Sequence, residues 1–305
     1  MNTTSSESAR TRFVFVGGAA RSGTTLVQKI LCAHHQIAGG PEFDQLVPIM
    51  QLYDRMRQPH RLERQAWYYS AEQLADRFRG FVNSLFDEVR SRFPDRLIIS
   101  EKTPANIAVA GLLLELFPDS RFIHVLRDGR DMLLSHKKVR ARFIAEKGAA
   151  ATPWLQDFDP KVLTGHWKAN VEQARQIEQH GPENIRKRFL TLRYEDLVAH
   201  PVEKLQELCQ HIGVALDPSM LNPEKVDPTV TGQIANIDNV WYTQAQFSQE
   251  FNTRSIGRWK SELSWSERWL ANLRMAPELE RLGFEVPPVV LAFRRFVDRL
   301  RGRRA

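Results

Sequence analysis

The sequence contains only two cysteines, Cys32 and Cys209, among its 305 residues. They lie far apart, and neither belongs to a C-x-x-C pair or to a Cys/His spacing of the kind that binds zinc. A disulfide framework and a cysteine-based zinc site are therefore not indicated as the basis of the fold. Two isolated thiols are most simply explained by a reducing compartment.

Long apolar runs are missing as well. No stretch reaches the roughly 20 apolar residues that a membrane-spanning helix needs. Residues 1–12 are polar and lack the apolar core of a signal peptide. From these absences we expect a cytoplasmic protein with a flexible N-terminal segment over residues 1–12.

Acidic residues are outnumbered by basic ones. The chain has 36 Asp and Glu against 43 Lys and Arg, which gives a net charge of +7. Such a surplus favours an anionic ligand, nucleic acid or an acidic membrane surface as the binding partner. The competing explanation is an ordinary charged surface with no particular partner.

Short apolar runs alternate with longer amphipathic segments, a pattern typical of α/β proteins with a mainly parallel sheet. We predict strands over residues 12–18, 36–39, 96–100, 121–126 and 188–192. We predict helices over residues 23–33, 70–89, 161–180 and 201–212, and two more that start near Thr103 and Asp128. The predicted fold is α/β, with a P-loop-like, open, mainly parallel sheet flanked by helices in a single domain over residues 13–286.

The loop after the first strand lacks the lysine of a phosphate-binding P-loop. Gly18 and Gly23 have the spacing of G-x-x-x-x-G-K-[ST], and Thr25 occupies the hydroxyl position, but Thr24 stands in place of the lysine. In a P-loop that lysine reaches the outer phosphates and the hydroxyl holds Mg²⁺. The loop therefore indicates a phosphate-bearing ligand that is bound without the lysine, and it leaves the need for a metal open.

Polar residues follow several predicted strands, and ligands of open parallel sheets bind beyond the carboxyl ends of the strands. Arg127 ends one strand, and Ser135 follows roughly two helical turns later, so that both side chains can face one phosphate. In the alternative interpretation, Arg127 pairs with Asp131 and Ser135 is merely exposed. Together with the first loop, the pattern predicts two phosphate sites on neighbouring strands.

Two separate phosphate sites are what 3′-phosphoadenosine 5′-phosphosulfate (PAPS) requires. The sequence resembles the PAPS-dependent sulfotransferases, in particular the branch of the tyrosylprotein sulfotransferases. The resemblance extends over residues 13–284. It rests on the following segments: 18–26, 40–42, 102–104, 125–135, 193–201 and 252–263.

The resemblance implies a role for each matching residue. Arg21, Ser22, Gly23, Thr24 and Thr25 would hold the 5′-phosphosulfate, and the product would be 3′,5′-ADP. The 3′-phosphate would be held by Arg127 and Ser135, and further contacts would come from Tyr194, Thr243 and Arg258. No metal would be needed, because cations and helix N–H groups can stabilise the leaving oxygen.

Three residues would take part in the chemistry. Lys102 resembles the family's lysine near the leaving oxygen, with Arg21 beside it. Glu42 matches the family's catalytic carboxylate, which takes the proton of the acceptor hydroxyl as a general base while the sulfuryl group is transferred in line. The alternative for Glu42 is a structural one, in which it caps a helix that starts near Phe43.

The resemblance is incomplete on the acceptor side. In the eukaryotic protein-tyrosine enzymes the pattern has a second glutamate and an arginine, whereas Asp44 replaces that arginine here. Those enzymes also carry a membrane anchor and lumenal disulfides, which this sequence does not show. The acceptor hydroxyl could therefore belong to a phenol or tyrosine, a sugar or a lipid headgroup.

Other functions stay open at this stage. One is a P-loop kinase or nucleotidase, and another is a non-catalytic protein that binds anions or nucleic acid, although we expect no nucleic-acid partner. Residues 287–305 form a basic amphipathic helix or tail, which suits an anionic membrane, a partner or the closure of the domain. A homodimer is also open. We expect Trp265 and Trp269 to be packing residues.

Overall fold

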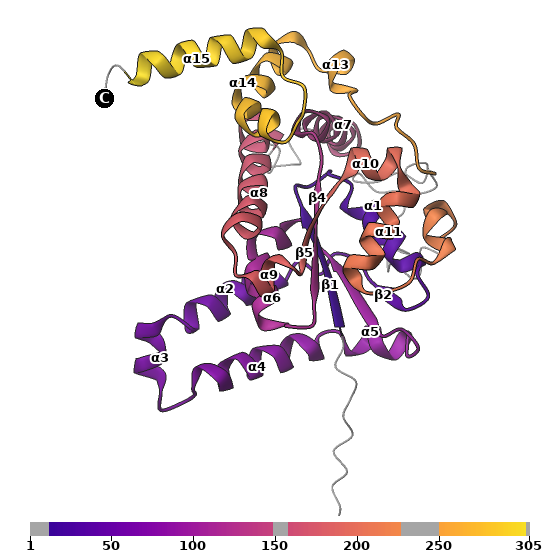
Figure 1. Ribbon diagram of the computed structural model, residues 1–305, viewed down its shortest axis with the longest axis vertical. Coiled ribbons are helices and arrows are strands. Elements are labelled where there is room, and N and C mark those ends of the chain that lie inside the picture. Colours follow the sequence, from indigo (N-terminus) through magenta and orange to yellow (C-terminus); the bar gives the residue numbers. More distant parts are fainter. Residues whose placement is uncertain (1–11, 149–157, 227–249, 303–305) are drawn as a thin grey trace, which may run out of the picture.

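The computed structural model describes residues 12–148, 158–226 and 250–302. Its centre is a five-stranded parallel sheet with the order β2-β3-β1-β4-β5 (Figure 1). The strands are β1 (Arg12–Gly18), β2 (Ile37–Gly39), β3 (Ile98–Lys102), β4 (Arg121–Leu126) and β5 (Phe189–Arg193). The prediction of an open parallel sheet flanked by helices is confirmed.

Strand β1 lies in the middle of the sheet because its apolar residues can be buried on both faces. Phe13 and Phe15 point to one face, where they pack with Phe86 and Phe117. Residues 14 and 16 point to the other face, as the two-residue period of a strand requires. The continuous apolar run of β1 in the sequence is thus explained by a strand that is buried on both faces of the sheet.

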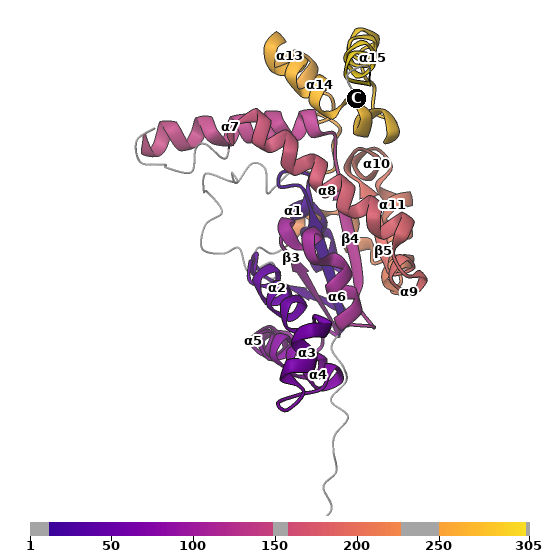
Figure 2. The same ribbon diagram turned by 90° about the vertical axis from the view of Figure 1, so that its left-hand side faces the viewer.

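Helices cover the two faces of the sheet (Figures 1 and 2). The face with residues 14 and 16 is covered by α1 (Thr24–Ala33), α10 (Tyr194–Ala199), α11 (Pro201–Ile212) and the short turns η4 (Pro218–Leu221) and η5 (Pro223–Lys225). The opposite face is covered by α2 (Leu46–Met56), α4 (Ala71–Ser84), α6 (Ala110–Leu116), α8 (Pro160–His180) and α9 (Glu183–Arg186).

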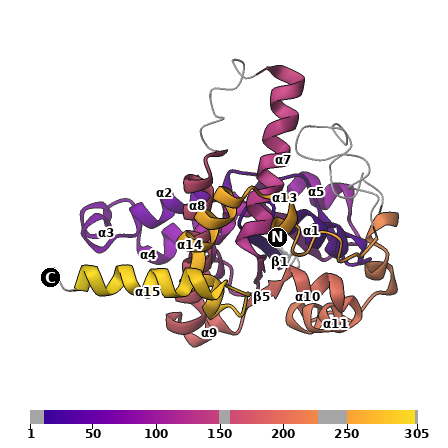
Figure 3. The ribbon, with the colours of Figure 1, turned by 90° about the horizontal axis from the view of Figure 1, so that it is seen from above.

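A third apolar cluster lies beyond the carboxyl ends of the strands. It joins α8 to α7 (Gly129–Lys147), α13 (Trp259–Glu262) and α14 (Trp265–Arg281). The last described helix, α15 (Pro288–Gly302), packs on α14 and extends away from the body of the molecule (Figure 3). Among the described helices, none has the length and apolar character needed to cross a bilayer.

Some predicted element bounds were wrong. The helix predicted over residues 70–89 begins where expected, and Ser70 and Gln73 form a capping box there, but it ends at Ser84, and α5 (Asp87–Arg92) follows separately. The predicted helix after Thr103 begins as a 3-10 helix, η1 (Pro104–Val109). The helix considered near Phe43 starts later, as α2 at Leu46, and helix α3 (Pro59–Gln65) was not predicted.

Candidate active site

The loop between β1 and α1 has an unusual backbone. Arg21 and Gly23 both lie in the left-handed region, with φ of 73° and 101°. A Cβ atom on Gly23 would lie 2.4 Å from Cδ2 of Tyr194, so only glycine allows this ring to pack on the loop. Helix α1 then begins at Thr24 with no side chain capping its first N–H groups. Such a helix start can bind an anion.

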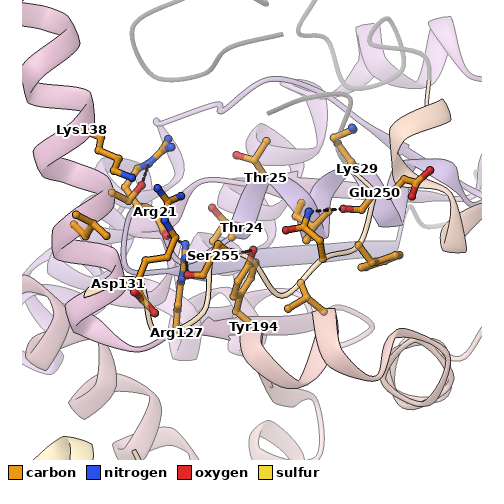
Figure 4. A pocket seen from close by; sticks show the side chains of 18 of the residues that line it. Arg21, Thr24, Thr25, Lys29, Arg127, Asp131, Lys138, Tyr194, Glu250 and Ser255 are labelled. Atoms are coloured by element: carbon orange, nitrogen blue, oxygen red, sulfur yellow. Dashed lines mark hydrogen bonds between the residues drawn. The ribbon is translucent and has the colours of Figure 1, made fainter. Parts of the chain in front are cut away.

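A cavity of about 260 Å³ lies over this loop (Figure 4). Most of the predicted nucleotide-binding residues line it: Arg21, Gly23, Thr24, Thr25, Arg127, Ser135, Tyr194 and Arg258. Ser22 is buried beneath the loop and does not line the cavity, and Thr243 lies outside the described residues. The structure thus brings together segments that are more than two hundred residues apart in the chain.

Arg127 is buried at the base of the cavity. Its Nη1 donates to the carbonyl oxygen of Arg21 at 3.1 Å and its Nη2 donates to the carbonyl oxygen of Ser255 at 2.9 Å. Its guanidinium lies 4.4 Å from the ring centroid of Tyr194, a cation–π distance. Asp131 instead accepts from the N–H groups of Gly257 and Trp259. The alternative Arg127–Asp131 ion pair is therefore not the arrangement in the structure.

Ser135 faces the same cavity from α7. Its Oγ accepts from Nε of Arg21 at 3.2 Å. Lys138 and Arg142, which the sequence analysis did not single out, also line the cavity. They follow Ser135 at positions i+3 and i+7 of the helix, so the helical period was a signal that could have identified them. One side of the cavity is therefore strongly cationic.

Among the described residues that line the cavity, two buried nitrogen atoms have no hydrogen-bond partner: Nε of Arg127 and Nη1 of Arg142. Buried donors are nearly always paired in folded proteins, so such atoms need an explanation. Oxygen atoms of a phosphate would satisfy both. The residues present therefore fit a nucleotide with more than one anionic group.

Lys102 and Glu42 meet beside this loop. Lys102 is the last residue of β3, with a side chain only 1% exposed, and its Nζ contacts a carboxylate oxygen of Glu42. The same Nζ lies 3.4 Å from Oγ1 of Thr25. Helix α2 starts at Leu46 after Gln45, so Glu42 does not cap it. The structural alternative for Glu42 thus loses its geometric basis, while the catalytic role stays a prediction.

Buried side chains hold the turn that carries Glu42. Gln28 on α1 donates to the carbonyl oxygen of Ser100 at 3.0 Å and to that of Gly40 at 3.5 Å. Glu101 accepts from the N–H of Phe43 at 3.4 Å and from Oγ1 of Thr103 at 2.7 Å. Burial raises the pKa of Glu101, which these hydrogen bonds oppose. Glu101 therefore serves to fix the turn, and Glu42 and Asp44 are the carboxylates left near solvent.

Lys29 is a further residue that the sequence analysis missed. It lines the cavity one helical turn after Thr25 (Figure 4), although its side chain is largely buried. Burial lowers the pKa of its ammonium group to about 8, which the nearby Glu224 opposes. The signal was the i+4 spacing from Thr25.

One set of potential metal ligands lies away from the cavity. Ligand atoms of His34, His35 and Asp217 are within 4.8 Å of one another. However, Nδ1 of His34 accepts from the N–H of Gln36, and its Nε2 donates to the carbonyl oxygen of Ala215. Both ring nitrogens of His34 are thus engaged, and the set fits a structural role at the end of α1.

Known proteins resemble this chain in sequence. The sequence model described as "Sulfotransferase family" matches residues 14–218. A protein-tyrosine sulfotransferase A from Caenorhabditis elegans is 26% identical over 278 residues, which are 90% of this chain and 67% of that protein. An omega-hydroxy-beta-dihydromenaquinone-9 sulfotransferase from Mycobacterium bovis is 29% identical over 60% of this chain and 46% of its own length.

Solved structures share the fold. The sulfotransferase domain of the olefin synthase from Synechococcus PCC 7002 superimposes with a TM-score of 0.55 at 18% identity, over 90% of this chain and 96% of that one. A mouse sulfotransferase complexed with PAP gives a TM-score of 0.50 at 12% identity, over 88% and 85% of the two chains. At these identities the likeness establishes the fold alone.

The prediction of a cytoplasmic location is wrong. The relatives matched by this chain include protein-tyrosine sulfotransferases from four animals, the branch whose members, as noted above, carry a membrane anchor and lumenal disulfides. The chain spans between 51% and 72% of the length of these relatives. The two thiols and the polar start of the chain therefore do not establish a compartment.

Proposed function

The chain belongs to the sulfotransferase family, and from that premise we propose that it moves a sulfuryl group from PAPS to an acceptor hydroxyl. One observation carries the proposal. The cavity joins the loop of residues 21–25 to Arg127 and Ser135, so one ligand can contact both. PAPS, which has a phosphosulfate at one end and a 3′-phosphate at the other, matches this arrangement.

The loop at the start of α1 would bind the 5′-phosphosulfate through its N–H groups and the hydroxyls of Thr24 and Thr25. Arg127 and Ser135 would bind the 3′-phosphate, with Lys138 adding positive charge on the same side. Tyr194 would fix the ligand indirectly, because its ring packs between Gly23 and the guanidinium of Arg127. Thr243 and Arg258 are proposed as further contacts.

PAPS, when bound, supplies the sulfuryl group and leaves as 3′,5′-ADP. Glu42 would take the proton from the acceptor hydroxyl, and positioned general bases contribute about 10²–10⁴ in rate. Lys102 touches both Glu42 and Thr25, so its ammonium links the acceptor side to the donor side. We propose that Lys102 and Arg21 stabilise the charge that develops on the leaving oxygen, without a metal ion.

The acceptor is proposed as a hydroxyl of a phenol or tyrosine, a sugar or a lipid. The names of the relatives include both a protein tyrosine and a hydroxylated menaquinone as acceptors. Beside Glu42, this chain carries a second carboxylate on Asp44, whose pKa is raised by burial and by Glu42. A turn with two carboxylates repels an acidic peptide, which makes an acidic tyrosine peptide the least suitable of these acceptors.

The proposal is tested with labelled PAPS. Extracts are incubated with the protein and the labelled donor, and mass spectrometry identifies the species that gain a sulfuryl group. We expect at least one hydroxylated compound to be labelled by the wild-type protein and not by Glu42→Gln. Labelling that requires the protein but is unchanged in Glu42→Gln would leave sulfuryl transfer intact and remove Glu42 as the base. The absence of any labelled species would count against the function itself.

A further inference from the structure

Helix α15 leaves an apolar face exposed. Val289, Phe293 and Phe296 are spaced i, i+4 and i+7 and therefore share one side of the helix. Their side chains are 62%, 43% and 58% exposed, whereas the neighbouring Val290 is buried against α14. The helix thus uses one face for packing and presents a second apolar face to the surroundings.

The exposed face continues onto α14. Trp265 is 71% exposed and stacks on Trp269, with ring centroids 5.9 Å apart. Trp269 in turn contacts Phe293 at 5.8 Å. The expectation that these tryptophans are packing residues holds for the contact of Trp269 with α15, but Trp265 remains open to the outside. We call Trp265, Phe293 and Phe296 the aromatic stripe.

A second exposed aromatic group lies far away in the sequence. Trp67 and Tyr68 are 92% and 71% exposed, in the turn between α3 and α4. Adjacent exposed apolar side chains can mark a contact with a membrane or with another protein. We call this pair the aromatic tip.

The tip and the stripe are carried by projections that leave the body on the same side. Figure 1 shows α3 and α15 at the left, at the lower and upper ends of the molecule, and Figure 3 shows the same side in the view from above. A single broad surface could therefore contact both. A small ligand or a single helix could not bridge two separate projections.

Exposed arginines accompany both aromatic groups. Arg61 and Arg64 precede the tip, and Arg295 and Arg299 are exposed on α15, the helix that carries Phe293 and Phe296. Trp, Tyr and Phe next to arginine are typical of proteins that lie at the interface of a membrane. A second copy of the chain would bring these like charges together, which costs energy. A surface of negative charge complements them.

We propose that the aromatic tip and the aromatic stripe dock the protein peripherally on an anionic lipid bilayer. The aromatic rings enter the region of the headgroups, and the arginines contact the anionic lipids. The proposal does not depend on the sulfuryl transfer, because neither group lines the cavity.

The test is flotation of the full chain with vesicles of phosphatidylcholine alone and of equal parts phosphatidylcholine and phosphatidylglycerol. We expect binding to the anionic vesicles that weakens as salt is added. The pair Trp67→Ala/Tyr68→Ala and the pair Phe293→Ala/Phe296→Ala should each lower the binding constant about tenfold. Arg295→Ala and Arg299→Ala should each lower it about fivefold, as expected for one basic residue near an anionic surface.

Val202→Ala is the matched control, because Val202 is 50% exposed on α11, at the opposite side of the molecule in Figure 1. It should bind vesicles as the wild type does. Unchanged 3′,5′-ADP binding and thermal midpoint in every variant would show that the fold is intact. Equal binding of the wild type to both kinds of vesicle would overturn the proposal. So would weaker vesicle binding in only one of the two aromatic double variants. A change in molar mass by light scattering with unchanged vesicle binding would also overturn it and assign the surface to self-association.

Discussion

The loop after β1 and the turn after β2 both bring polar groups to the same edge of the sheet, but they are held in different ways. The loop has Arg21 and Gly23 in left-handed conformations, and Arg127, which itself lines the cavity, donates to the carbonyl oxygen of Arg21. The turn of residues 40–45 also has a left-handed residue, Asp44, but the side chains that bind its backbone, Gln28 on α1 and Glu101 on β3, do not line the cavity. The loop faces a cavity, whereas Glu42 lies beside Lys102 and does not line that cavity.

This difference separates two tasks. A loop held by a side chain that also lines the cavity suits a ligand that stays the same, such as a nucleotide. A turn held by buried side chains away from the cavity can change its exposed side chains without losing its position, which suits a variable acceptor. Changes in the loop should therefore alter nucleotide affinity, and changes in the turn should alter turnover.

The largest effect is expected for Glu42→Gln. The loss of a positioned general base should lower kcat by about 10²–10⁴ while the affinity for 3′,5′-ADP stays within a few-fold. Steady-state kinetics on the labelled acceptor and calorimetry measure the two quantities. Asp44→Asn is the matched control on the same turn and should keep kcat within a few-fold. Turnover of the Gln variant close to the wild-type value would show that another residue is the base.

Lys102→Ala should come next. We expect kcat to fall by about 10²–10³, the usual cost of removing one group that stabilises developing charge, with a smaller change in nucleotide affinity. Lys137→Ala, on the exposed side of α7, is the control and should be neutral. The wild-type activity should also survive excess EDTA. A variant that is impaired only in binding would make Lys102 a nucleotide ligand and no more.

Arg127→Ala tests the loop side of the comparison. The wild type should bind 3′,5′-ADP more tightly than 5′-AMP, and the variant should lose most of that preference. The expected loss of binding free energy is about 1.5–3 kcal/mol, because Arg127 makes a charge-assisted contact with the 3′-phosphate. Titration calorimetry with both nucleotides measures it. If the wild type binds the two nucleotides with equal affinity, Arg127 and Ser135 do not bind a 3′-phosphate.

Gly23→Ala should weaken nucleotide binding about tenfold, because the new Cβ meets the ring of Tyr194 and the left-handed backbone costs about 1–2 kcal/mol. Gly165→Ala in α8 is the control, since no atom lies within 4 Å of its added Cβ. Its affinity should equal that of the wild type. An unaffected Gly23→Ala would mean that the backbone shape of the loop does not determine the site.

The smallest effect concerns Lys29. Its folded pKa of about 8 lies below the usual value of 10.5, so the unfolded chain binds more protons between these two pH values. Stability should therefore rise as pH increases through this window. Affinity for the anionic nucleotide should instead fall above about pH 8, as the ammonium loses its charge. Lys29→Met should remove both trends, which denaturant titration and calorimetry at several pH values can follow.

Local sequence signals predicted the sheet well. The runs at residues 12–18 and 121–126 became β1 and β4 with the expected bounds, because buried parallel strands read as continuous apolar segments. The break after Ser84 was not predictable in the same way. Leu85 and Phe86 continue the apolar spacing of the helix, so the sequence gives no sign that α4 ends at Ser84. The structure gives the reason, because Phe86 is buried against Phe13 and Phe43.

The parts of the candidate site that lie in short sequence motifs were predictable. Sequence motifs identified the loop of residues 21–25 and the segment 125–135 as binding elements. The contact of Lys102 with Glu42 was not predictable, because it depends on the pairing of β2 with β3, which no local signal specifies. Lys29 and Arg142 were missed because the sequence does not show that one cavity lies over both helices. Only with that cavity known does their helical spacing from Thr25 and Ser135 identify them as lining residues. Thr243 stays a prediction from resemblance, since it falls outside the described residues.

The central claim is that one cavity binds a nucleotide with phosphates at both ends. Its most direct test is calorimetric titration of the wild-type protein with 3′,5′-ADP in EDTA and, separately, with ATP and Mg²⁺. We predict tight, metal-independent binding of 3′,5′-ADP and much weaker binding of ATP. Preferential binding of magnesium ATP would contradict the account and favour a kinase or nucleotidase.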